Sequence, residues 1–100
     1  MSTAGAPPVL DKGTPGSVRV SGELTFANAT AALAAIGAAT RDGRATLDLS
    51  GVTRSDSAGL ACVLAVLAEA AGRGRPLSVS HLPEGMRLLA SVCEVESLLV

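Results

Sequence analysis

Residues 47–60 read LDLSGVTRSDSAGL, and this stretch decides the fold that the sequence predicts. Leu47 and Leu49 alternate with polar neighbours, which is the pattern of a half-buried strand over residues 45–49. After a polar junction, residues 58–71 are almost wholly apolar and rich in alanine and leucine. They predict a helix that is buried on more than one side. A strand, a short polar turn and a buried helix therefore follow one another directly.

The same two patterns recur on both sides of this stretch. Strands are expected at residues 17–24 and 76–80, and helices at residues 27–39 and from Pro83 to about residue 93, with a short turn and strand at residues 95–100. Alternating strands and helices imply crossover connections and a parallel sheet. The sequence thus predicts a single α/β domain with a mixed, mainly parallel sheet of four to five strands and three to four helices.

The domain is expected to occupy residues 17–100. Residues 1–16 hold three prolines and three glycines, so they are interpreted as a flexible N-terminal arm. Within this arm only Val9 and Leu10 suggest structure, as a short edge strand.

Two helix faces are assigned from the spacing of apolar residues. Leu33, Ile36 and the pair Ala39/Thr40 mark the inward face of the first helix, and either Thr25 or Asn28 could cap it. In the last helix, the inward face is expected at Met86, Leu89 and Val92/Cys93.

The composition limits what the protein can bind. The chain has 100 residues, of which 48% are apolar, and its formal net charge is −1, so it can support one core. Phe26 is the only aromatic residue, and the eight basic residues are spread among nine acidic ones. Binding of nucleic acid needs aromatic platforms or a basic face, so no nucleic-acid partner is expected.

The cysteines and the hydropathy pattern suggest a protein without metal or membrane segments. Cys62 and Cys93 lie inside apolar runs and are interpreted as small buried residues. Because His81 is the only histidine, no metal and no cofactor are expected. The longest apolar run, residues 60–68, falls well short of the roughly 20 residues of a membrane span. With no signal-peptide pattern, the sequence predicts a cytoplasmic protein that does not insert directly into the membrane.

The junction Asp56-Ser57-Ala58-Gly59 is the best candidate for a functional site. Function in open α/β sheets collects at the carboxyl ends of strands, where this junction is expected. Ser57 could simply cap the helix, or the free N–H groups there could accept an anion. Gly59 would let a partner or a phosphate approach the backbone closely. Catalysis is not expected, because the pattern Gly-x-Ser-x-Gly is missing and His81 follows a different strand.

Three stretches together resemble a STAS domain, the fold of sulfate transporters and anti-sigma-factor antagonists. They are VRVSGELTF at residues 18–26, LDLSGVTRSDSAGL at residues 47–60 and GRPLSVSHLPEGMRLLASVCEVESLL at residues 74–99. The resemblance spans about residues 17–99 and is greatest to the stand-alone MlaB-type proteins. It implies a non-enzymatic cytoplasmic accessory subunit, peripheral to the inner membrane, that binds the ATPase of an ABC-type phospholipid transporter and helps maintain outer-membrane lipid asymmetry.

The face around Ser57 and the helix at residues 58–71 are expected to bind the partner, because a small, glycine-containing helix start allows close approach. Ser57 would be a contact or a phosphorylation site. The partner-binding loop would comprise Arg54, Ser55, Asp56, Ala58 and Gly59. The alternative function that the resemblance implies is an anti-sigma-factor antagonist, which a partner kinase regulates by phosphorylating Ser57. Many such antagonists carry Asp after Gly-Glu-Leu, where this chain has Thr25, and this departure weakens the kinase alternative.

Overall fold

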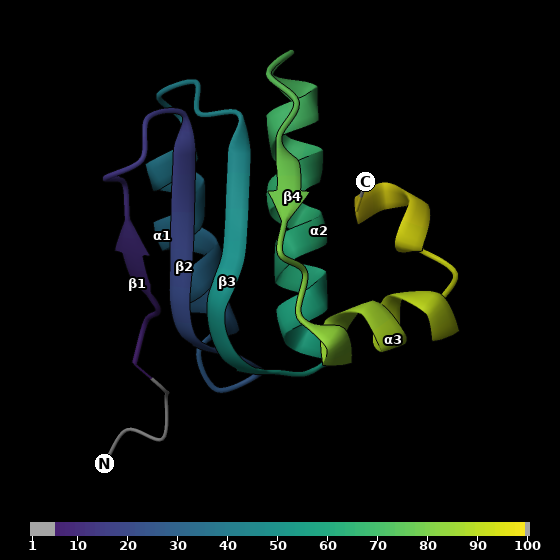
Figure 1. Ribbon diagram of the computed structural model, residues 1–100. Helices are drawn as coiled ribbons and strands as arrows, with labels where there is room; N and C mark the ends of the chain where they lie inside the picture. The colour runs from purple at the N-terminus through teal and green to yellow at the C-terminus, as the bar shows by residue number, and fades with distance from the viewer. Residues whose placement is uncertain (1–5, 100) are drawn as a thin grey trace.

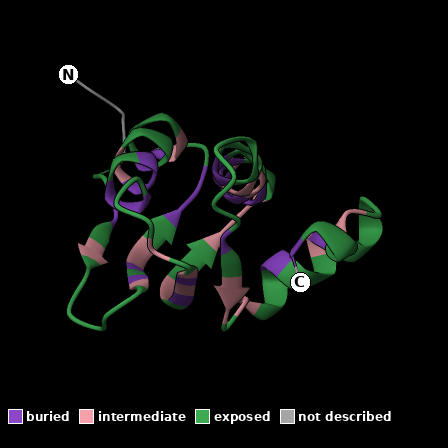
Figure 2. Ribbon diagram, turned by 90° about the horizontal axis from the view of Figure 1, so that it is seen from above, coloured by how far each residue is buried: buried purple, intermediate pink, exposed green. Residues whose placement is uncertain are grey.

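A computed structural model describes residues 6–99, which form one sheet with two helices packed on one of its faces (Figures 1 and 2). The elements are β1 (Val9–Asp11), β2 (Ser17–Leu24), α1 (Ala29–Thr40), β3 (Thr46–Ser55), α2 (Ser57–Gly72), β4 (Ser78–Ser80), α3 (Glu84–Val92) and the 3-10 helix η1 (Glu96–Leu99). The predicted class, a single α/β domain with a mainly parallel mixed sheet, is confirmed. None of the helices within residues 6–99 is long and apolar enough to span a membrane.

The strands lie in the order β1-β2-β3-β4. β2, β3 and β4 are parallel, and β1 pairs with β2 in the antiparallel sense. β1 contains Val9 and Leu10, so the expected edge strand is present. Whether the first residues of the chain form a flexible arm stays a prediction, because residues 1–5 lie outside the described part of the structure.

Alternation along the strands separates the two faces of the sheet. Val18 and Val20 of β2, and Leu47 and Leu49 of β3, are fully buried under α1 and α2 (Figure 2). The residues between them are polar and point to the opposite face, which no element of residues 6–99 covers. Burying each of these aliphatic side chains contributes about 1.5–3 kcal/mol to stability, so this one-sided core holds the helices on the sheet.

α1 buries the face that the sequence predicts, except at Leu33. Ile36, Ala39 and Thr40 are buried as expected, together with Ala32, whereas Leu33 is 37% exposed. Leu33 instead lines a groove between α1 and α2. The buried Thr40 hydroxyl donates to the carbonyl oxygen of Ile36 at 2.9 Å, which satisfies it inside the core. Asn28 stands at the N-cap position, but its side chain accepts instead from the backbone N–H of Thr25 at 3.0 Å.

The C-terminal elements depart further from expectation. Met86 is buried in α3 as predicted, but Val92 is 82% exposed and Cys93 is also exposed, since Ala90 takes the inward position one turn after Met86. η1 replaces the expected turn and strand over residues 95–99. Cys62 is buried as predicted, and this burial raises the pKa of its thiol.

β3 is twice as long as predicted and continues to Ser55. The reason is pairing with β2, which extends to Leu24 opposite Ser55 despite a register shift between Gly22 and Glu23. A second register shift lies between Arg19 and Ser21, and both mark bulges or irregularities in this pairing. This extension carries the end of β3 to the start of α2 with a single residue between them.

Candidate functional site

The predicted partner-binding loop is not a loop in the structure. Arg54 and Ser55 are the last residues of β3, and Ala58 and Gly59 belong to the first turn of α2. Only Asp56 lies between the two elements. The six predicted residues are contiguous at the carboxyl end of a central strand, so the expected location is confirmed while the expected conformation is wrong.

Asp56 is the residue that caps α2. Its Oδ1 accepts from the backbone N–H of Gly59 at 3.0 Å, and its Oδ2 accepts from the backbone N–H of Phe26, also at 3.0 Å. The capping role expected of Ser57 therefore belongs to the residue before it. The hydrogen bond from Phe26, followed by those from Gly59 and Ala58, lowers the pKa of Asp56 against an opposing effect of burial. One carboxylate thus joins the segment that leads into α1 to the start of α2.

Ser57 is the first residue of α2 and is exposed. Because Asp56 already caps the helix, the Ser57 side chain is not required for capping. An exposed hydroxyl at this position can contact a partner or accept a phosphoryl group. The hydroxyl is accessible from outside the molecule.

Gly59 serves the fold rather than a ligand. It is buried, and a Cβ atom built on it would overlap the carbonyl oxygen of Leu24 at the end of β2. The expectation that Gly59 lets a partner or a phosphate approach is therefore wrong, since the chain itself occupies that space. The contact holds α2 against the end of β2, and this in turn sets where Ser57 emerges.

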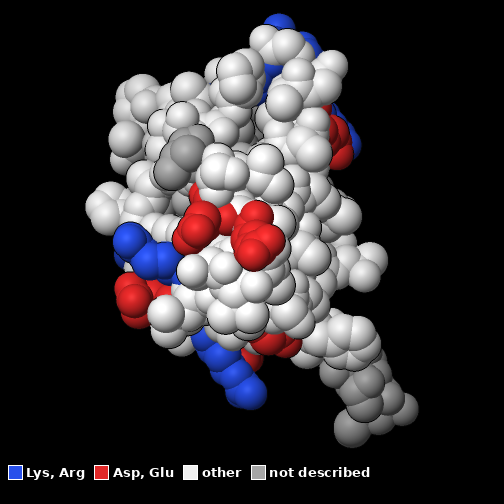
Figure 3. All heavy atoms as spheres, turned by 90° about the vertical axis from the view of Figure 1, so that its right-hand side faces the viewer, with Lys and Arg blue, Asp and Glu red and all other residues white. Residues whose placement is uncertain are grey.

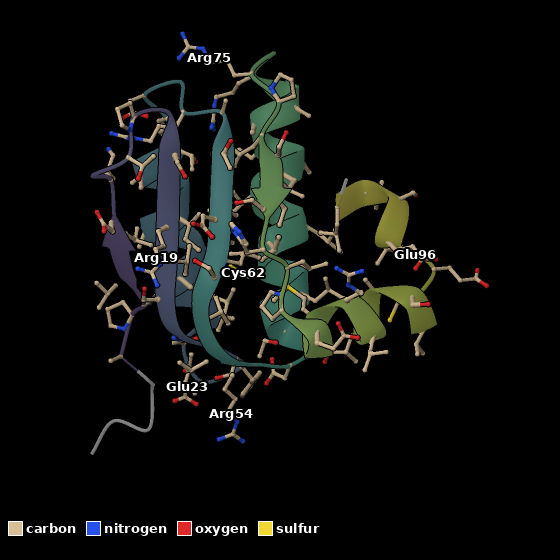
Figure 4. The ribbon with its side chains drawn as sticks, viewed as in Figure 1. Arg19, Glu23, Arg54, Cys62, Arg75 and Glu96 are labelled. Carbon is tan, nitrogen blue, oxygen red and sulfur yellow. The ribbon has the colours of Figure 1, made fainter. Side chains whose placement is uncertain are left out.

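Arg54 lies at the outer rim of the site. Its Nη1 is 3.7 Å from Oε1 of Glu23, on the neighbouring strand β2, and both side chains are well exposed (Figure 4). Exposed ion pairs of this kind contribute little to stability because water screens them. Arg54 and Glu23 are therefore free to exchange this contact for one with a partner.

An apolar groove beside Ser57 was missed by sequence reasoning. It has a volume of about 370 Å³ and runs between α1 and α2. Its lining is Ala29, Thr30, Leu33, Ala58, Ala61, Cys62 and Ala65. The only signal in the sequence is the lack of charge: α1 has no charged residue, and α2 has none before Glu69.

Phe26 is the second feature that sequence reasoning did not assign to the site. Its side chain is 84% exposed, although it is the only aromatic residue of the chain. Its backbone is held by the carboxylate of Asp56, so it lies next to the start of α2. An exposed aromatic ring and an uncharged groove are both typical of protein-protein interaction surfaces. We call Phe26, Ser57 and the groove residues the α1–α2 surface.

His81 lies outside this surface and is exposed. It follows β4 with a φ of 55°, and its Nδ1 is 3.1 Å from Oδ1 of Asp48. Burial raises the pKa of Asp48, but hydrogen bonds from Ser50 and His81 outweigh this effect and keep that pKa below its ordinary value. Within residues 6–99, no three potential metal-ligating side chains gather into a cluster.

Comparison with known proteins identifies the class to which this fold and site belong. The structure is similar to the anti-sigma factor antagonist SpoIIAA in its unphosphorylated form, with a TM-score of 0.61 and 21% identity over 84% of this chain and 81% of that one. It is also similar to the crystal structure of Mglu, with a TM-score of 0.54 and 25% identity over 76% of this chain. The match covers only 19% of the Mglu chain. These two similarities show the fold of the chain.

The particular family follows from the sequence itself. The model of the family described as Mlab, STAS domain matches residues 10–100, and the chain belongs to that family. No curated protein matches the chain. STAS domains are in general regulatory or accessory domains that act through protein-protein contacts, which agrees with a site made of an exposed serine and an uncharged surface.

Proposed function

We propose that this protein is a non-enzymatic accessory subunit that binds the ATPase of an Mla-like ABC phospholipid transporter through its α1–α2 surface. Membership of the family described as Mlab, STAS domain supports the choice of partner. In this role the protein would be cytoplasmic, held at the inner membrane by the transporter, and it would support the ATPase in maintaining outer-membrane lipid asymmetry.

The observation that carries the proposal is the uncharged surface around Ser57. Ala58, Ala61 and Ala65 form the α2 wall of the groove, and the exposed Phe26 precedes α1, with its backbone N–H bonded to Asp56 at the start of α2. Small side chains let a partner helix approach closely, and a surface without charges can be buried at little desolvation cost. Phe26 would supply the anchor, since burying an aromatic ring contributes about 1.5–3 kcal/mol.

Ser57 would act as the polar contact at the edge of this interface. Its hydroxyl can donate and accept one hydrogen bond each without bringing a charge to the surface. The neighbouring ion pair of Arg54 and Glu23 forms a charged rim on the sheet side. A polar rim around an apolar centre is the usual arrangement of protein-protein interfaces. The subunit needs no chemistry of its own for this role, because its effect comes from stabilising a conformation of the ATPase.

The proposal predicts that a charge placed in the groove prevents binding. Ala61→Arg puts a guanidinium group on the α2 wall, so co-purification with the transporter ATPase should fall by at least about tenfold, as expected for a buried unpaired charge. Ala71→Arg is the matched control, because Ala71 is also exposed on α2 but does not line the groove. Both variants should keep the melting temperature of the wild type. Equal binding by the two variants would show that the interface lies elsewhere.

The alternative function, an anti-sigma-factor antagonist, is favoured by the exposure of Ser57 at the first position of α2. A kinase can reach this hydroxyl, and a phosphate would add about −1.5 to −2 charges beside the Asp56 carboxylate and the uncharged groove. Phosphorylation would therefore release a partner bound to the α1–α2 surface.

Mass spectrometry separates the two functions. If the transporter proposal holds, protein isolated from its own cell carries no phosphate on Ser57 and co-purifies with an ABC ATPase and a permease. Stoichiometric phospho-Ser57, together with a co-purifying kinase in place of these proteins, would reverse the order of the two functions. Ser57→Ala is the control in this experiment, since it removes the acceptor hydroxyl without adding charge.

A further inference from the structure

A second cleft is lined by residues of β4, α3, η1 and the segment between β4 and α3. α3 lies on the opposite side of the molecule from α1 (Figure 1). The cleft has a volume of about 650 Å³. Its lining is Val79, His81, Leu82, Arg87, Glu96, Ser97 and Leu99. None of these residues lines the α1–α2 groove, so the cleft is not part of the site described above.

One side of the cleft is an unpaired strand edge. β4 is the last strand of the sheet and pairs only with β3. The backbone N–H of Ser78 donates to the carbonyl oxygen of Ala45 at 2.8 Å, so Ser78 and Ser80 direct their peptide groups toward β3. The N–H and C=O of Val79, between them, must therefore point the other way. These groups face the cleft and can pair with an added extended chain.

The floor of the cleft is apolar. Val79 and Leu82 are half-buried, and Leu99 is almost completely buried. Together they offer contact for one aliphatic side chain of an incoming segment. Such pockets beside a strand edge give specificity when a peptide is added to a sheet, while the main-chain hydrogen bonds give affinity.

The rim of the cleft carries charges of opposite sign on its two walls. Arg87 stands on the α3 wall, where it is 65% exposed and has only a long contact of 3.8 Å with Glu84. Glu96 stands on the η1 wall. His81 also lines the cleft, but its Nδ1 is engaged by Asp48. Figure 3 faces this side of the molecule and shows acidic side chains near the centre of the view, with basic side chains to the left of them and below them.

We propose that this cleft binds an extended peptide segment of another protein, added as a strand beside β4, with an apolar residue flanked by one acidic and one basic residue. Successive side chains of an extended chain point to opposite faces. An apolar residue turned toward Val79, Leu82 and Leu99 therefore sends its two neighbours to the rim. There, an acidic side chain can meet Arg87 and a basic one Glu96. This inference does not depend on the transporter proposal, because it concerns a different surface.

The test uses the pentapeptide Ac-Thr-Glu-Val-Lys-Thr-NH2 and its reversed order, Ac-Thr-Lys-Val-Glu-Thr-NH2, in NMR titrations of the labelled protein to about 1 mM. One of the two orders should bind at least about fivefold more tightly, since only one places the acid at Arg87. The backbone amide of Val79 should shift and exchange more slowly with solvent. The preferred peptide N-methylated at its three central residues should bind at least about tenfold more weakly, because it cannot form the main-chain hydrogen bonds.

Two variants complete the test. Arg87→Glu should weaken the preferred peptide by about fivefold or more, whereas Arg75→Glu, a change of the same charge far from the cleft, should leave binding unchanged (Figure 4). If the N-methylated peptide binds as tightly as the unmodified one, the cleft binds side chains only, and no strand is added to β4. Shifts confined to residues outside the cleft, or no shift at any concentration used, would each overturn the proposal.

Discussion

Gly59→Ala is expected to lower the free energy of unfolding by about 3 kcal/mol, the upper end of the usual range for overpacking. The new methyl group would overlap the carbonyl oxygen of Leu24, which belongs to the backbone and cannot rotate away as a side chain can. Relief of this overlap requires α2 to move away from the end of β2. In a 100-residue domain the loss corresponds to a fall of about 15 °C in melting temperature.

Gly72→Ala is the control for this substitution. Gly72 is also in α2, at its last position, but a Cβ atom there would have no neighbour within 4 Å. Alanine favours a helix over glycine by about 1 kcal/mol, so this variant should be unchanged or slightly more stable. Thermal melts of the three proteins by circular dichroism make the comparison. A Gly59→Ala protein that melts with the wild type would show that β2 and α2 are less tightly joined than their contact implies.

The overlap in Gly59→Ala would also change the α1–α2 surface. Asp56 is bonded both to Gly59 and to Phe26, so movement of the first turn of α2 would displace the aromatic ring together with Ser57. Gly59→Ala should therefore weaken partner binding as well as stability. Ala61→Arg, by contrast, should weaken binding without changing stability. The two variants therefore distinguish Gly59, which positions the surface, from Ala61, which is part of it.

Local patterns predicted β2 and α2, because in these two elements the spacing of apolar residues alone defines the buried face. The alternation in SVRVSGEL gave β2 with its observed bounds, Ser17–Leu24, and the apolar run after Asp56 gave α2 to within one residue at each end. In both cases a long periodic segment is buried on a defined face, so its pattern reports its structure directly.

The features that could not be predicted depend on contacts between distant parts of the chain. The last residues of β3 are polar, and only pairing with β2 keeps them in the strand. Val92 looks like a core residue in its own helix, but the last turn of α3 turns Ala90 inward and leaves Val92 82% exposed. Phe26 joins the site because Asp56, thirty residues later, holds its backbone N–H. No periodicity encodes such a contact.

Asp56→Ala is expected to cost about 2 kcal/mol, the upper part of the range for loss of a helix N-cap. The carboxylate satisfies two backbone N–H groups from different segments, at Gly59 and at Phe26, and alanine satisfies neither. Asp56→Asn should cost roughly half as much, because its single carbonyl oxygen can accept from only one of the two segments at a time. Asp11→Asn is the matched control, since Asp11 accepts only from nearby Gly13 and joins no distant segments.

The pH dependence provides an independent check on the same carboxylate. The pKa of Asp56 is lower in the folded protein, chiefly because of the hydrogen bond from Phe26. Its stabilisation is therefore fully present above the unfolded value of about 3.9 and is lost as the pH falls through the folded value. Asp42 and Asp48 also have lowered pKa values, so the wild type and Asp56→Asn should both lose stability in acid. The wild type should lose more, so the gap between their melting temperatures should narrow from about pH 6 to about pH 3. A gap that stays constant over this range would mean that Asp56 acts through its shape alone, and not through the charge that ties the start of α2 to Phe26.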